Sequence, residues 1–154
     1  MIEQLELLRR HAAWADARML AALRAAGASF PAAALREQAH VRGAQATWLA
    51  RIAGEGPLLD IWPDLTVDEL EEVGQVLDAR SLQLHAQLSP EDFSRVVSYR
   101  NSRGEPFETP LVDVLQHLAL HGQYHRGKVN AGLRSVGAEP VAVDYIVWSR
   151  LGRP

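Results

Sequence analysis

Apolar residues recur at three- and four-residue spacings in four long stretches of the chain. The stretches cover residues 3–26, about Pro31 to Ala53, Thr66 to the Ser89-Pro90 pair, and Pro110 to about Val136. Such spacing places the apolar side chains on one face of an α-helix. Four helices that each hide one apolar face predict an all-α four-helix bundle, because packing the faces together buries all of them.

Residues near the predicted helix ends support these boundaries. Thr66 and Glu69 have the spacing of a capping box, in which each side chain bonds a free backbone amide of the first turn. Thr109 before Pro110 predicts an N-cap followed by proline at the first helical position. Gly27 and Gly137 follow the first and fourth stretches, as expected of residues that end helices.

The connections between the helices differ in character. Residues 54–64, GEGPLLDIWPD, form a loop interrupted by glycine and proline. Residues 94–109 predict a short β-hairpin or extended excursion before the last long helix, with a plain loop as the alternative. Connections of this length permit a long crossover connection, which we expect, although the pattern alone does not choose between crossover and up-and-down topologies. The tail segment VDYIVWSR is either a short strand or a final helical turn.

Composition excludes several classes of protein. Residues 1–154 are expected to form a single domain, and 47% hydrophobic with 23% charged residues excludes intrinsic disorder. A net charge of -3 lacks the basic stripe of a nucleic-acid binder. Glu3 and Glu6 interrupt any signal-like apolar start, and no window reaches 18 uncharged apolar residues, so no membrane association is expected. These features predict a cytoplasmic protein.

The histidines carry the strongest chemical signal. The chain has no cysteine, so any transition-metal site must use its six histidines and its carboxylates. His117, His121 and His125 recur every four residues, and each such step turns only about 40° around a helix. All three therefore project from one side, which we expect to face the bundle interior together with neighbouring leucines.

A histidine pair four residues apart is a common bidentate arrangement for a metal. His40, on the apolar side of the second helix, is the best candidate for a third ligand. The spacing does not decide whether the pair is His117 with His121 or His121 with His125. Core histidines that bond protein groups are the alternative interpretation.

The segments HLALHGQYHRGKV, HVRGAQATWLARI and SYRNSRGEPF together resemble the DinB/YfiT-like superfamily of metal-binding four-helix bundles. The resemblance implies a homodimer and one divalent metal ion held by His40, His121 and His125, with His117 as a neighbour. It also implies thiol chemistry, since several relatives transfer bacillithiol, mycothiol or glutathione. Lys128 departs from the pattern, because members commonly have glutamine there.

These observations predict a divalent-metal-dependent enzyme that transfers a low-molecular-weight thiol to an electrophilic small molecule. Zinc, nickel and iron all suit imidazole ligands. Arg126 is a candidate contact for a substrate carboxylate, with a surface salt bridge or dimer contact as the alternative. Tyr124 is expected to point away from the site, and Trp14 and Trp48 to pack in the core. The competing functions are a metal-dependent hydrolase and a non-enzymatic metal-binding stress-response bundle.

Overall fold

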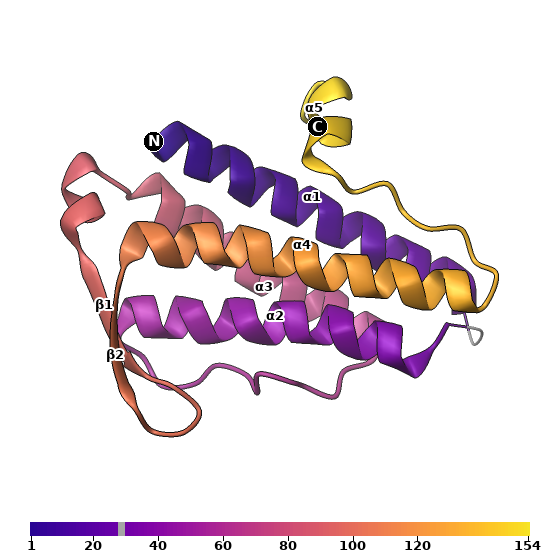
Figure 1. Ribbon diagram of the computed structural model, residues 1–154, viewed down its shortest axis with the longest axis horizontal. Coiled ribbons are helices and arrows are strands. Elements are labelled where there is room, and N and C mark those ends of the chain that lie inside the picture. Colours follow the sequence, from indigo (N-terminus) through magenta and orange to yellow (C-terminus); the bar gives the residue numbers. More distant parts are fainter. Residues whose placement is uncertain (28–29) are drawn as a thin grey trace.

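Four long helices dominate the computed structural model, which describes residues 1–27 and 30–154 (Figure 1). They are α1 (Ile2–Ala26), α2 (Ala32–Ala53), α3 (Val67–Ala86) and α4 (Leu111–Ser135). Between α3 and α4 lie a 3₁₀ helix, η2 (Pro90–Ser94), and an antiparallel hairpin of β1 (Val96–Arg100) and β2 (Pro106–Pro110). A short helix, α5 (Tyr145–Arg150), follows near the C-terminus. The predicted all-α bundle with a hairpin before its last long helix is confirmed.

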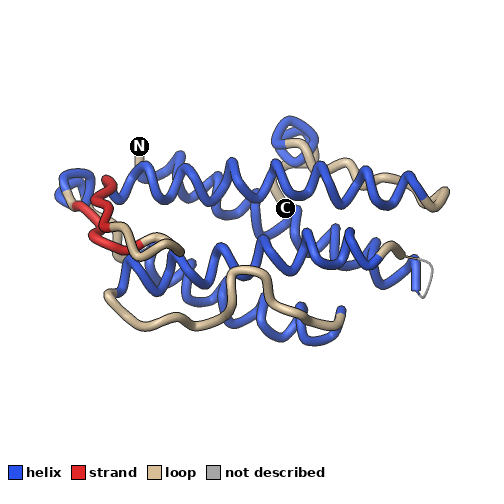
Figure 2. The backbone as a smooth tube through the Cα atoms, turned by 60° about the horizontal axis from the view of Figure 1, so that its bottom comes forward, coloured by secondary structure: helices blue, strands red, loops and turns tan. Residues whose placement is uncertain are grey.

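The order of the helices around the bundle differs from their order along the chain. Helix α1 packs against α3 and α4, and α2 packs against the same two helices. Figure 1 shows α1 and α4 running in one direction and α2 and α3 in the other. The connection over residues 54–66 must therefore travel the length of the bundle, and Figures 1 and 2 show it lying alongside α2. This connection is the long crossover that the sequence led us to expect.

The helix boundaries follow local chemistry with one exception. The capping box is present, because Thr66 Oγ1 accepts from the amide of Glu69 and the Glu69 carboxylate accepts from the amide of Thr66. The predicted N-cap at Thr109 is wrong: this residue pairs with Val97 in the hairpin, and Pro110 is the N-cap without a side-chain cap bond. Strand pairing up to Pro110 therefore takes precedence over the capping preference. The tail adopts the helical alternative as α5.

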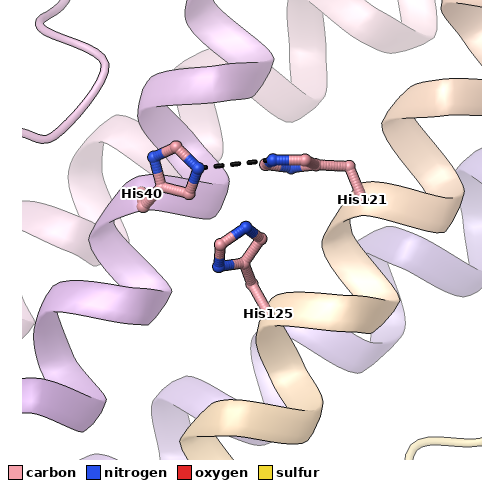
Figure 3. A group of neighbouring side chains, drawn as sticks. All are labelled: His40, His121 and His125. Carbon is pink, nitrogen blue, oxygen red and sulfur yellow. Dashed lines mark hydrogen bonds between the residues drawn. The ribbon is translucent and has the colours of Figure 1, made fainter.

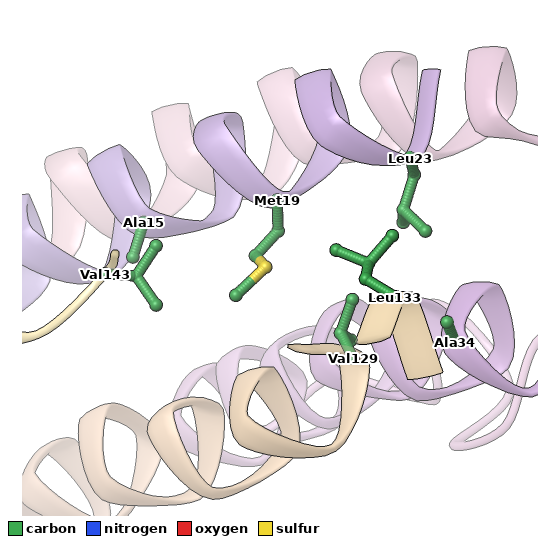
Figure 4. Packing of buried hydrophobic residues seen from close by; sticks show 7 residues of the cluster. All are labelled: Ala15, Met19, Leu23, Ala34, Val129, Leu133 and Val143. Carbon is green, nitrogen blue, oxygen red and sulfur yellow. The ribbon is translucent and has the colours of Figure 1, made fainter. Parts of the chain in front are cut away.

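Apolar residues fill the two ends of the bundle. Figure 4 shows the cluster near the C-terminal end of α4, formed by Ala15, Met19, Leu23, Ala34, Val129, Leu133 and Val143. A second cluster at the hairpin end comprises Leu5, Ile52, Val97, Leu111, Val114 and Leu115. Burying one large apolar side chain contributes about 1.5–3 kcal/mol, so these clusters are major sources of stability. Trp14 packs against the first cluster and Trp48 against the second, as predicted.

The long helices also keep polar faces toward solvent. Arg24 of α1, for example, forms ion pairs with Asp68 and Glu71 of α3 at exposed positions.

Among the described residues, no helix combines the length and the apolar character that crossing a bilayer requires.

Candidate metal centre

The histidine row on α4 passes from solvent into the bundle along its length. His117 is exposed, His121 is partly buried, and His125 is buried with 5% of its surface exposed. The prediction that the whole row faces the interior is therefore wrong for His117. The reason is the advance of about 40° for every four residues, which turns the row by about 80° between its ends. His117 instead forms a T-shaped contact with Trp48, with the ring centroids 5.7 Å apart.

Three histidines from two helices converge beside this row. His40 of α2 meets His121 and His125 of α4, and one ligand atom from each lies within 4.8 Å of the others. In Figure 3 the three rings surround a common centre. The Nε2 atoms of His40 and His121 are 3.3 Å apart, close to the edge of about 3.3 Å in a tetrahedral site with bonds of about 2.0–2.1 Å. This group could hold a metal ion.

Protein acceptors orient two of the three rings. His40 Nδ1 lies 2.8 Å from the carbonyl oxygen of Ile61, and His125 Nδ1 lies 2.5 Å from the Glu37 carboxylate. A carbonyl or carboxylate oxygen can only accept, so both histidines must carry hydrogen on Nδ1. Their Nε2 atoms then present lone pairs toward the third ring (Figure 3). His121 Nε2 can donate to the His40 Nε2 lone pair at 3.3 Å, and outer carboxylate or carbonyl partners such as Glu37 and Ile61 are typical of histidine metal ligands.

Burial keeps two of the imidazoles, those of His40 and His121, in the neutral form that binds a cation. Burial lowers the pKa of His40. Burial and the neighbouring histidines lower the pKa of His121 to about 4, so both rings are neutral at pH 7. Although burial raises the pKa of Glu37, the hydrogen bond from His125 and the charge of Lys128 hold it below its ordinary value. The site thus combines three imidazoles with one ionised carboxylate behind His125.

Glu37 was not among the residues selected from the sequence. It lies one helical turn before His40, a spacing that places the two side chains on the same face of α2. Glu37 also contacts Lys128. The Lys128 Nζ lies 3.5 Å from the Glu37 carboxylate and 4.7 Å from the centre of the Tyr124 ring. Tyr124 is largely exposed, in agreement with its predicted position outside the ligand group.

Arg126 lies inside the bundle rather than on its surface. The residue is fully buried, and its Nη1 is 2.8 Å from Asp16 Oδ1 of α1. The alternative role as a surface salt bridge is therefore wrong. Arg126, Asp16 and His121 all line a partly open pocket of about 50 Å³. Contact between Arg126 and a substrate remains a prediction.

Comparison with known proteins finds similarity at the level of sequence. The sequence model of the DinB family matches residues 6–151. The protein named Protein DinB of Bacillus subtilis (strain 168) is 28% identical over 79 residues, which are 51% of this chain and 45% of that protein. The matched stretch therefore spans less than half of that relative, and no solved structure matches the chain significantly. Because the family match covers nearly all of its residues, this chain belongs to the DinB family.

Proposed function

We propose that this chain is a divalent-metal-dependent enzyme that transfers a small-molecule thiol to an electrophilic substrate. The observation that carries the proposal is the convergence of His40, His121 and His125 beside a partly exposed surface. Three protein ligands leave coordination positions for other molecules, which is characteristic of catalytic sites. The chain has no cysteine, so the thiol must be supplied by a second small molecule.

The chain's residues would hold and orient the reacting groups. A bound divalent ion supplies charge that lowers the pKa of a thiol and stabilises its thiolate. His40 and His125 would be fixed by Ile61 and Glu37, while partly buried His121 stands nearer the solvent. The thiolate attacks carbon and forms a carbon–sulfur bond. With an epoxide the thiol proton ends on the opened oxygen, and with an activated halide the halide ion leaves while the proton passes to solvent.

A base on the open side of the metal would favour hydrolysis. Glu37 is the carboxylate that contacts the group, but it bonds His125 Nδ1, on the side of the ring away from the other two histidines. This placement suits the orientation of a ligand and does not suit proton removal from a metal-bound water. Thiol transfer is therefore the better-supported function.

The proposal also includes the location, the partners and the oligomeric state of the protein. We place the protein in the cytoplasm, with neither nucleic acid nor membrane as a partner, and as a homodimer. Leu120 and Tyr124, exposed by 70% and 64% on the outer face of α4, provide apolar surface for a second copy. Mass measurement in dilute solution tests the homodimer, and a monomer at all concentrations would contradict it.

The direct test combines metal-loaded protein with a panel of small thiols and a model epoxide or activated halide. Conjugation above the uncatalysed rate is expected for the loaded protein and not for His125→Ala. His85→Ala is the matched histidine control, because His85 lies on α3 outside the ligand group. Cleavage of an ester without thiol would support the hydrolase instead. Metal binding without either reaction would support the non-enzymatic bundle.

A further inference from the structure

The backbone of the crossover connection approaches α2 closely at Gly43, near His40. A Cβ atom built on Gly43 would lie 2.4 Å from the Ile61 carbonyl oxygen and 2.5 Å from the Asp60 carbonyl oxygen. Ordinary contacts of this kind are 3.4–4 Å long, and both neighbours are backbone atoms that no side-chain rotation can remove. Only glycine therefore permits this approach.

The same carbonyl is the hydrogen-bond acceptor of the metal-site histidine. Gly43 lies three residues after His40, so both occupy the face of α2 on which the connection rests. The Ile61 oxygen that approaches Gly43 lies 2.8 Å from His40 Nδ1. The next residue, Trp62, stacks on the His40 ring with centroids 3.7 Å apart and planes 13° from parallel. Arg36 lies over the Trp62 ring, 5.4 Å from its centre.

We propose that Gly43 is a positioning residue for the metal site, acting through the Ile61 carbonyl to fix the tautomer and direction of His40. This inference rests on the proposed metal site and adds how that site is assembled. With hydrogen held on Nδ1 by the carbonyl, His40 presents its Nε2 lone pair toward His121. Trp62 limits tilting of the ring by covering one of its faces.

Replacing Gly43 with alanine separates the connection from α2. The Ile61 oxygen has to retreat by about 1 Å to restore an ordinary contact with the new methyl group. A hydrogen bond that starts at 2.8 Å does not survive such a shift without rotation of the ring. Loss of an outer partner of a metal-binding histidine typically lowers metal affinity by about 10–100-fold.

The experiment titrates cobalt(II) and zinc(II) into the full-length wild type, Gly43→Ala and Gly127→Ala. Gly127 is the matched control, since it lies in a long helix and a Cβ there meets nothing within 4 Å. We expect Gly43→Ala to bind each metal about 10–100-fold more weakly and Gly127→Ala to bind like the wild type. Equal affinity in folded Gly43→Ala and the wild type would overturn the inference. Absence of binding to the wild type would instead contradict the proposed metal site.

A second measurement needs no metal, and its main arm needs no variant. Nitrogen-resolved NMR of the imidazoles in the metal-free wild type identifies which His40 nitrogen carries hydrogen. Hydrogen on Nδ1 is expected, and hydrogen on Nε2 would overturn the inference even if Gly43→Ala failed to fold. In folded Gly43→Ala we expect the His40 signal to lose its single Nδ1-protonated form. A glycine needed only for helix packing would leave that signal unchanged.

Discussion

The bundle contains two buried polar clusters that differ in how their charges are balanced. The ionic core consists of Asp16, Arg42, Asp78 and Arg126, in which two carboxylates face two guanidinium groups. Asp16 lies 2.8 Å from Arg126 and 3.6 Å from Arg42, and Arg42 lies 2.7 Å from Asp78. The histidine group of His40, His121 and His125 instead brings together three imidazoles that could hold a metal ion.

This difference separates stability from function. In the ionic core each charge has its partner within the chain, and although burial raises the pKa of Asp16, Arg126 and Arg42 hold it below its ordinary value. The histidine group instead offers three ligand atoms to a metal ion. We therefore expect changes in the ionic core to alter folding, and changes in the histidine group to alter metal binding.

The largest effect on stability is expected from Asp16→Ala. The substitution leaves Arg126, a fully buried cation, without its carboxylate partner and removes the acceptor of Gln38. Breaking a buried pair on one side costs about 3–5 kcal/mol of unfolding free energy. Denaturant unfolding of the metal-free protein measures the loss. A cost below about 1 kcal/mol would show that the ionic core does not stabilise the bundle.

His121→Ala is expected to produce the opposite pattern. Removing one of three ligands lowers metal affinity by more than the roughly 100-fold upper range for outer partners. The unfolding free energy of the metal-free protein should change by less than about 1 kcal/mol, because His121 is partly exposed and its charge is disfavoured. Metal titration and denaturant unfolding of the same preparation measure both. Unchanged affinity would remove His121 from the ligand set.

A smaller effect on metal affinity is expected from Glu37→Gln. Glutamine cannot supply the negative charge that holds hydrogen on His125 Nδ1, so affinity should fall by about 10–100-fold. Lys128→Gln is the matched control, since the Lys128 side chain is 42% exposed and contacts the Glu37 carboxylate. It should change affinity only a few-fold. A loss of affinity in Glu37→Gln matched by a gain of the same size in Lys128→Gln would show that net charge, not the contact with His125, determines affinity.

The smallest effect concerns His85, a half-buried histidine of α3 outside both clusters. Burial lowers its pKa from 6.5 to about 4, although Glu6 acts in the opposite direction. Between these values the unfolded chain binds a proton that the folded chain does not, so unfolding free energy falls as the pH drops from about 6.5 to about 4. His85 should account for about 1–2 kcal/mol of that fall. Comparing metal-free wild type with His85→Leu measures this part, and identical pH profiles would contradict it.

The helices and the histidine spacing could be predicted because they depend on neighbours in sequence. The capping box of Thr66 and Glu69 is such a local feature, and it is present as predicted. The prediction of an N-cap at Thr109 was wrong because the pairing partner of Thr109, Val97, lies 12 residues earlier, and strand pairing overrode the local capping preference. The prediction that His117 faces the interior was wrong because the buried face of α4 depends on where α1 and α2 pack against that helix.

Partners from distant helices account for what the sequence did not predict. Asp16 pairs with Arg126 across 110 positions, and nothing near either residue indicates the other. Glu37 contacts His125 across 88 positions. The close approach at Gly43 likewise depends on the path of the crossover, which the apolar pattern left open. The resemblance to the DinB/YfiT-like superfamily, rather than spacing alone, selected His40, His121 and His125.

Element-specific metal analysis tests the convergence of the three histidines most directly. The protein should be purified without a histidine tag, and measured as wild type, His125→Ala and His85→Ala. We predict close to one divalent ion per chain in the wild type and in His85→Ala, and almost none in His125→Ala. A wild type without metal, or a His125→Ala variant that keeps its full complement, would contradict the assignment of these histidines as a metal site.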